Sequence, residues 1–205
     1  MAEHWVSELY GYKVEKREIR RPGGKLYFFN SHTQVGVLHT TEGGDSVDGA
    51  YSTLAKSFSA PHFIIGPGRI IQCRPLTVQG AALRGQAPYF ANAQASIQIE
   101  ICANSQAKLW LPRAETVDAL AAVIAYCAGN GIDIPLRVPY PDWPDDVSDM
   151  KLPWAVEKTA RRARTAKDNF KAKGWYEHLE IPGNNHYDCG AMRRTEILSL
   201  AQQLL

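Results

Sequence analysis

The sequence predicts a single α/β domain with a mixed central β-sheet flanked by helices. Runs rich in β-branched and apolar residues indicate strands at 35–41, 62–66, 70–75 and 96–103. Helical spacing of apolar residues interleaves with these strands, as in other α/β folds. The chain has 205 residues, 45% hydrophobic and 21% charged, which suits one globular domain. We therefore treat 1–205 as one domain.

The predicted strands follow a polar, mixed segment of 30 residues, in which no strand is assigned. Pro67-Gly68-Arg69 indicates a hairpin turn between the second and third strands. The fourth strand alternates strictly over 96–101, so its isoleucines face one side while Gln98 and Glu100 face the other. On this pattern alone, Glu100 is either a solvent-facing residue, which the pattern favours, or a buried group kept for a purpose.

Four helices are expected, at 47–59, 115–128, 155–172 and 193–204. The second ends at Gly129-Asn130-Gly131, and the fourth is amphipathic. The segment 135–153 contains five prolines and lies between two helices. We interpret it, with the basic helix up to about residue 173, as an insertion within the same domain.

The charge is uneven: residues 155–173 hold seven Lys or Arg against two acids, although the whole chain is only +2. Such a helix face is usually just solvated, and the alternative is attraction to an anionic cell wall. No groove-reading motif accompanies it, so a nucleic-acid partner is not expected. The N-terminus shows no signal peptide, no apolar run reaches the roughly 20 residues of a membrane span, and the cysteines are expected to be reduced.

Two segments carry residues suited to metal chemistry. His39 ends an apolar strand before Gly43-Gly44, where a hydrogen-bonded strand-edge histidine is the simpler interpretation when this segment is taken alone. The segment 175–190 concentrates two histidines, Asp188 and Cys189 in a turn-rich stretch. Catalytic zinc usually takes three protein ligands and a water, so this density favours a metal site over a plain surface loop.

Together these segments resemble the type 2 N-acetylmuramoyl-L-alanine amidases. That family includes many phage endolysins and shares its fold with the peptidoglycan recognition proteins. The resemblance covers about 35–104 and 174–192 and consists of four motifs in the family's order. These are the strand ending at His39, the hairpin from Ala60 to Ile70, the strand Ser96-Ile97-Gln98-Ile99-Glu100, and His178 with Asp188-Cys189-Gly190.

The resemblance implies a Zn²⁺-dependent enzyme that cleaves the amide bond between N-acetylmuramic acid and L-alanine of peptidoglycan. It also implies a role for each matching position. The zinc ligands would be His39, His178 and Asp188, the catalytic residues Glu100 and His186, the substrate contacts Thr40 and Arg84, and the framework histidine His62.

The chain departs from the family pattern at three places. Cys189 replaces the usual proline and competes with Asp188 as third ligand, although register with His178 favours Asp188. His186 stands where Lys is commoner, and Arg84 replaces an aromatic-His contact. Two alternatives stay open: a non-catalytic peptidoglycan-binding module, and an intracellular amidase that recycles muropeptides. For an endolysin we expect a monomer made in the cytoplasm and released by a holin or by lysis.

Overall fold

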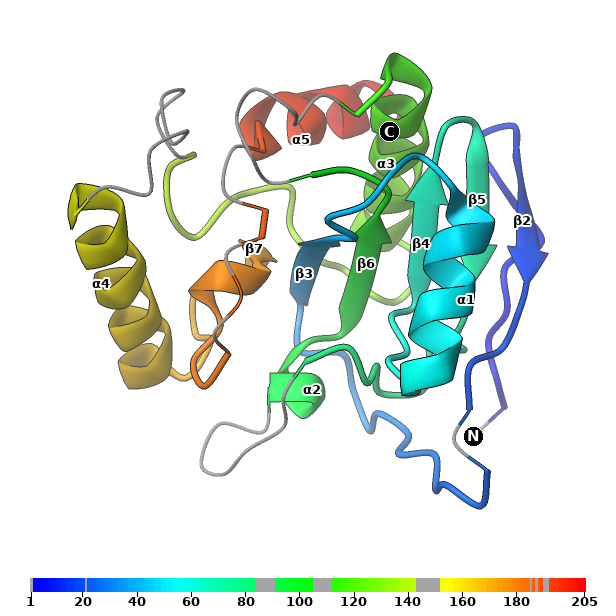
Figure 1. Cartoon of the computed structure of the whole chain (residues 1–205), viewed down its shortest axis with the longest axis horizontal. Coiled ribbons are helices and arrows are strands. Elements are labelled where there is room, and N and C mark those ends of the chain that lie inside the picture. The colour runs from blue at the N-terminus through cyan, green and yellow to red at the C-terminus, as the bar shows by residue number, and fades with distance from the viewer. Residues whose placement is uncertain are drawn as a thin grey trace.

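The computed structural model describes residues 2–20, 22–83, 91–104, 112–142, 152–184, 186, 188–189 and 192–205. For residues 152–157 it describes the backbone only. Within these ranges a seven-stranded sheet has the order β1-β2-β5-β4-β6-β3-β7 (Figure 1). The strands are β1 (Glu8–Leu9), β2 (Tyr12–Lys16), β3 (Val35–Thr40), β4 (Phe63–Gly66), β5 (Arg69–Gln72), β6 (Ile97–Ile101) and β7 (Gly174–Glu177). The helices are α1 (Val47–Ser57), α2 (Ala91–Gln94), α3 (Ala114–Ala128), α4 (Leu152–Asp168) and α5 (Arg194–Gln203), with a 3₁₀ turn η1 (His178–Glu180).

The sheet is mixed, as predicted. Strand β3 pairs in parallel with both β6 and β7, and β6 pairs in parallel with β4. Strand β5 runs antiparallel to β4 across the predicted hairpin. The carboxyl ends of β3, β6 and β7 therefore meet at one edge of the sheet, which is where ligands bind in open α/β sheets.

Helices cover both faces of the sheet. On one face, the alanine-rich α3 and the apolar side of α5 pack on Leu38, Ile97 and Ile99. On the other, α1 places Val47 against Ile64 and Ile71. Helix α1 begins where the Ser46 side chain accepts a hydrogen bond from the Gly49 amide. Figure 1 shows α4 beyond the β7 edge of the sheet, where it packs against η1.

The Trp175 side chain packs directly against Gly36, where β7 pairs with β3. Gly36 pairs with Trp175, and a Cβ at position 36 would lie 2.3 Å from the indole ring. Only glycine leaves room for this ring, which is fully buried.

The four predicted strands and four predicted helices all exist, with boundaries shifted by a few residues. Helix α4 begins at Leu152, so the last two residues of the predicted insertion loop are helical. Strands β1, β2 and β7 and the short helix α2 were not predicted. Strands β1 and β2 extend the sheet from the polar N-terminal segment, where alternation is weak.

A buried ion network lies where β7 meets α5. Arg194 is fully buried; its Nε lies 3.2 Å from Glu177, and its Nη1 donates to Glu180 at 2.9 Å. The same guanidinium donates to the Trp175 and Tyr140 carbonyls. Arg161 of α4 adds a second cation, 2.8 Å from Glu180. The network ties α4, β7, η1 and α5 together.

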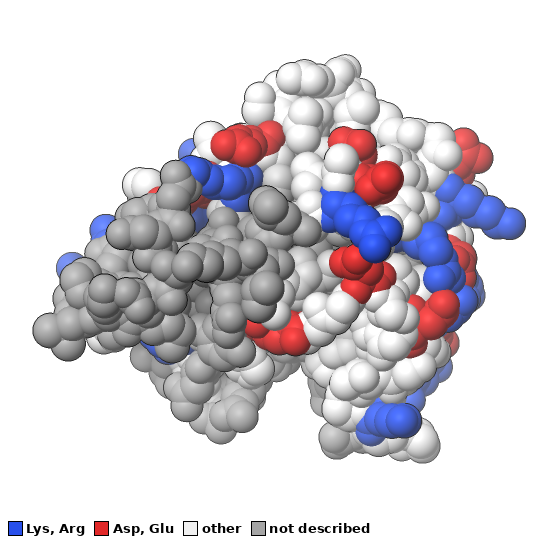
Figure 2. Space-filling model, turned by 45° about the horizontal axis from the view of Figure 1, so that its top comes forward, with Lys and Arg blue, Asp and Glu red and all other residues white. Residues whose placement is uncertain are grey.

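Three further predictions from the sequence concern the state of the cysteines, the lack of a membrane span and the distribution of surface charge. All four cysteines are free and buried. Among the described residues, no helix has the length and apolar character needed to cross a membrane. On the face drawn in Figure 2, acidic and basic side chains of the described residues are interspersed. This view therefore gives no sign of an extended area of one charge in the described part of the chain.

Candidate metal centre

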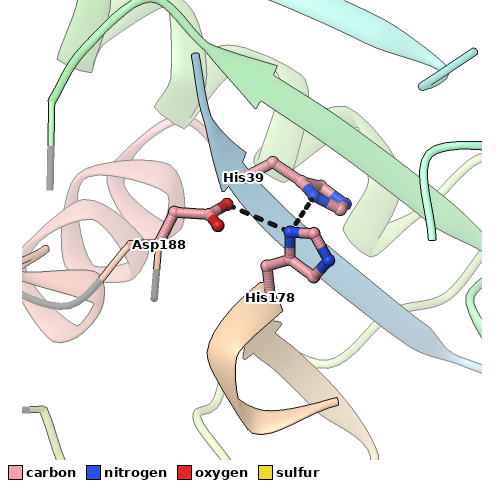
Figure 3. Close-up of side chains that lie close together, drawn as sticks. All are labelled: His39, His178 and Asp188. Atoms are coloured by element: carbon pink, nitrogen blue, oxygen red, sulfur yellow. Dashed lines mark hydrogen bonds and ion pairs between the residues drawn. The ribbon is translucent and has the colours of Figure 1, made fainter. Parts of the chain in front are cut away.

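Three predicted ligands converge at the carboxyl edge of the sheet. His39 is the fifth residue of β3, and His178 directly follows β7, the next strand in the sheet. Asp188 arrives from the loop after η1. One ligand atom from each residue lies within 4.8 Å of the other two, and all three residues are buried (Figure 3).

The contacts within this cluster are short. The Nδ1 atoms of His39 and His178 lie 3.0 Å apart, and His178 Nδ1 lies 3.2 Å from Asp188 Oδ2. Figure 3 shows the two rings and the carboxylate directed at a common point. The Thr40 amide donates to the same Oδ2 atom at 3.2 Å and so orients the carboxylate.

Asn184 identifies the protonated nitrogen of His178. Its Oδ1 lies 3.1 Å from His178 Nε2, and its Nδ2 donates to the Pro182 carbonyl. Because Oδ1 is an acceptor, His178 Nε2 must carry the proton, and a neutral ring then has a bare lone pair on Nδ1. That lone pair faces a carboxylate oxygen and another imidazole nitrogen. The cluster is therefore rich in acceptors, as a cation site requires.

This arrangement fits a zinc ion. Ligand atoms of a tetrahedral zinc site lie roughly 3.3 Å apart when each is about 2.0–2.1 Å from the ion. The distances of 3.0 and 3.2 Å are close to that value. These three residues can bind a metal.

The surroundings shift the pKa values of His39 and Asp188. Burial, reinforced by His178, lowers the pKa of His39 well below its usual range, which keeps the ring neutral. Burial would by itself raise the pKa of Asp188. Hydrogen bonds with His178 and His186 outweigh that effect and leave its pKa below the ordinary value. Neutral imidazoles and an ionised carboxylate are the forms that bind metal.

Glu100 is buried, so the solvent-facing interpretation was wrong. It pairs with His39 across the β3–β6 ladder, and α1 covers this face of the sheet. Burial raises the pKa of Glu100 well above its usual range, and the nearby charges of Asp188 and Glu42 add to the shift. Its carboxyl group borders a cavity of about 250 Å³ between α1 and the Gly43-Gly44 turn. A buried carboxyl group in a cavity beside a cation site is well placed to exchange protons.

His186 lies at the surface side of the cluster. Its ring stacks on His178 with centroids 4.3 Å apart, and its Nδ1 lies 3.5 Å from Asp188 Oδ1. Its side chain is 52% exposed. With Asn184 and Leu83, His186 also borders a second cavity of about 370 Å³.

Of the other predicted site residues, those that the structure describes do not belong to the cluster of three. The Thr40 hydroxyl donates to Glu42 at 2.6 Å, and Cys189 packs in the apolar core beneath the sheet rather than in the cluster. His62 uses both ring nitrogens, one on the Val78 carbonyl and one on the Gln98 amide, as a framework residue does. Arg84 lies outside the described residues.

Sequence reasoning missed Asn184 and the arginines that surround the ligand loop. An asparagine after Pro182-Gly183 has the appearance of an ordinary turn residue, and nothing in the spacing indicates a histidine partner. Arg161 and Arg162 have the appearance of members of a solvated basic face. Their partners lie more than fifteen positions away in the sequence.

Comparison with solved structures identifies the fold class, which is the peptidoglycan recognition protein and amidase-like fold. The chain shares it with Staphylococcus aureus hydrolase AmiA, solved in complex with its ligand, at a TM-score of 0.56 and 13% identity over 94% of this chain and 82% of that one. The predicted fold is therefore confirmed.

Other matches are a mutant endolysin from Bacillus subtilis (TM-score 0.46, 19% identity, 61% of this chain and 80% of that one) and the wild-type recognition protein PGRP-LB of Drosophila (TM-score 0.46, 17% identity, 61% and 79%). No protein-family model and no curated protein matches the sequence.

Proposed function

We propose that the chain is a zinc-dependent N-acetylmuramoyl-L-alanine amidase that hydrolyses bacterial peptidoglycan, of the phage endolysin type. The observation that carries this proposal is the buried convergence of His39, His178 and Asp188, with one ligand atom of each within 4.8 Å of the other two. The fold is consistent with it. We propose residues 1–205 as one catalytic domain that acts as a monomer on the cell wall after release from the cytoplasm.

Each residue of the site then has a task. His39, His178 and Asp188 would hold the ion, which when bound supplies an acidified water and a polarised substrate carbonyl. Glu100 would accept the proton of the attacking water and donate it to the leaving amine of L-alanine. Its raised pKa suits this exchange, because burial favours the protonated form from which the carboxyl group donates to the leaving amine.

His186 would donate a hydrogen bond to the carbonyl oxygen as negative charge develops there. Its exposed ring, held against His178, can reach a chain lying in the 370 Å³ cavity. Thr40 and Arg84 are proposed substrate contacts from the family resemblance, and Thr40 also orients Asp188 through its amide.

The test is digestion of purified wall, followed by mass spectrometry of the products and metal analysis of the same protein sample. We expect one zinc ion per protein chain. We also expect new free amino groups on L-alanine, with the muramic lactyl group intact. Cleavage at another bond would contradict the proposal. Wall binding without any product would instead favour the non-catalytic module, and activity confined to soluble muropeptides would favour the recycling amidase.

The third ligand has its own test. Asp188→Ala should lose zinc, because Asp188 belongs to the cluster and Cys189 to the apolar core. Cys189→Ala should keep zinc at the wild-type stoichiometry. The reverse result would make the thiolate the ligand.

A further inference from the structure

Two of the three candidate ligands, His178 and Asp188, lie on the segment after β7, which needs a fixed conformation to bind a metal. His178, His186 and Asp188 belong to one segment that leaves the sheet after β7. Metal ligands need placement to within about 0.5 Å, and loops do not provide this by themselves. Within the segment, the Leu179 amide donates to the Asp188 carbonyl at 2.8 Å. Further support comes from helix α4.

Arg162 of α4 contacts both ends of this segment. Its Nε donates to the Leu179 carbonyl at 2.6 Å, and its Nη2 donates to the His186 carbonyl at 2.7 Å. Leu179 directly follows the ligand His178, and His186 lies two residues before the ligand Asp188. One half-buried guanidinium therefore spans the segment between two of the three candidate ligands.

The preceding residue strengthens the attachment. Arg161 is buried and donates to Glu180 at 2.8 Å, and Glu180 in turn accepts two hydrogen bonds from Arg194. The start of the segment is thus fixed to α4 and α5 together. Arg161 belongs to the buried frame, whereas Arg162 is the residue that reaches the far end of the segment.

We infer that Arg162 is a positioning residue of the candidate metal centre and that α4 is part of the site, an inference that rests on the proposed function. The planar guanidinium fork supplies two donors in fixed directions, and these match two carbonyls on separate turns of the chain. A lysine ammonium at the same place keeps the charge but cannot hold both carbonyls in one rigid geometry. Replacing a group that orients metal ligands typically weakens metal affinity 10–100-fold.

The experiment measures zinc affinity of the purified full chain by competition with a chromophoric chelator. The variants are Arg162→Gln, Arg162→Lys and the control Lys167→Gln, which makes the same charge change at an exposed position of the same helix. We expect both Arg162 variants to lose about tenfold or more in affinity, and the control to stay within about twofold of wild type. In the metal-free protein, hydrogen exchange at residues 179–188 should accelerate in the Arg162 variants only.

Wild-type zinc affinity in Arg162→Gln would overturn the inference, whatever the exchange shows. Retained affinity in Arg162→Lys alone would also overturn it, since charge rather than bridging would then explain the effect. If Arg162→Gln does not fold, Arg162→Lys decides. Failure of the wild-type chain to bind zinc would overturn the proposed function instead, and the same titration detects it without any variant.

Discussion

Two buried polar clusters lie on opposite faces of the sheet at the end of β7. On the α5 face, Arg194 contacts Glu177, Glu180 and two backbone carbonyls, and Arg161 also contacts Glu180, so two cations face two anions. On the other face, Nδ1 of His39 and Oδ2 of Asp188 lie 3.0 and 3.2 Å from Nδ1 of His178, which the contact with Asn184 leaves as an acceptor. Consecutive residues of the chain, Glu177 and His178, belong to different clusters.

The comparison distinguishes polar residues that are buried to hold the fold together from polar residues that are buried to bind a ligand. A buried network whose cations and anions balance needs no ion from outside the chain. A buried set of acceptors without a cation costs free energy in the metal-free protein, and binding a cation offsets this cost. The comparison therefore predicts which substitutions reduce stability and which reduce activity.

The largest expected effect is on turnover. Glu100→Gln removes the proposed proton acceptor while preserving size, so the rate of wall hydrolysis should fall about 10²–10⁴-fold. Zinc content should stay at the wild-type level, because Glu100 is not among the clustered ligands. Product release from purified wall and metal analysis of the same sample measure both. Hydrolysis at the wild-type rate would remove Glu100 from the mechanism.

The structural cluster should give the largest loss of stability. Arg194→Met leaves Glu177 and Glu180 with only part of their compensating charge, and breaking such buried pairs costs about 3–5 kcal/mol. Urea unfolding of the metal-free protein measures this. The matched control is Arg20→Met, which removes exposed ion pairs with Glu18 and Glu3 and should leave stability almost unchanged. Equal losses in the two variants would contradict the distinction drawn between the clusters.

Zinc should stabilise the acceptor-rich cluster by mass action. At a free zinc concentration of 100 times the dissociation constant, the free energy of unfolding should rise by about 2.7 kcal/mol. His39→Ala should abolish this increase, since it removes one ligand. Chemical unfolding at several zinc concentrations provides the measurement. An undiminished increase in His39→Ala would locate zinc binding elsewhere.

Stability should also depend on pH through Glu100. The pKa of Glu100 is raised in the folded state, so its contribution to stability is fully present below its unfolded pKa. That contribution is lost as pH rises through the folded value, because the buried carboxyl group must ionise. Glu100→Gln should therefore gain stability relative to metal-free wild type as pH rises above about 4.5, by at most about 1.4 kcal/mol per pH unit. A difference independent of pH would show that Glu100 titrates normally.

The sequence predicted the elements with strong local patterns. The apolar strand before His39, the alternation at 96–101 and the alanine-rich helix each determine their own conformation, and β3, β6 and α3 follow them. Strand β7 was missed because Gly174–Glu177 is only four residues long and has no alternation typical of a half-buried strand.

The candidate site was predicted unevenly for a similar reason. The motifs named the three residues that cluster, since ligand types are visible in the sequence. The burial of Glu100 depends on α1 covering its face, and the partners of Arg161 and Arg162 depend on where α4 lies against η1. Both depend on how the helices pack in three dimensions, and the periodicity of a single sequence carries no information about that packing. The roles of Glu100, His186 and the metal ligands remain predictions.

The Gly36–Trp175 contact gives the edge strand a single permitted alignment. Sliding β7 by one residue along β3 would carry the indole away from the only position without a side chain, and it would turn His178 toward the opposite side of the sheet. The Trp175 ring, the bulkiest of the strand, therefore fits against β3 in one register only. Three residues further along, the same alignment determines whether two imidazoles from distant parts of the chain meet at all.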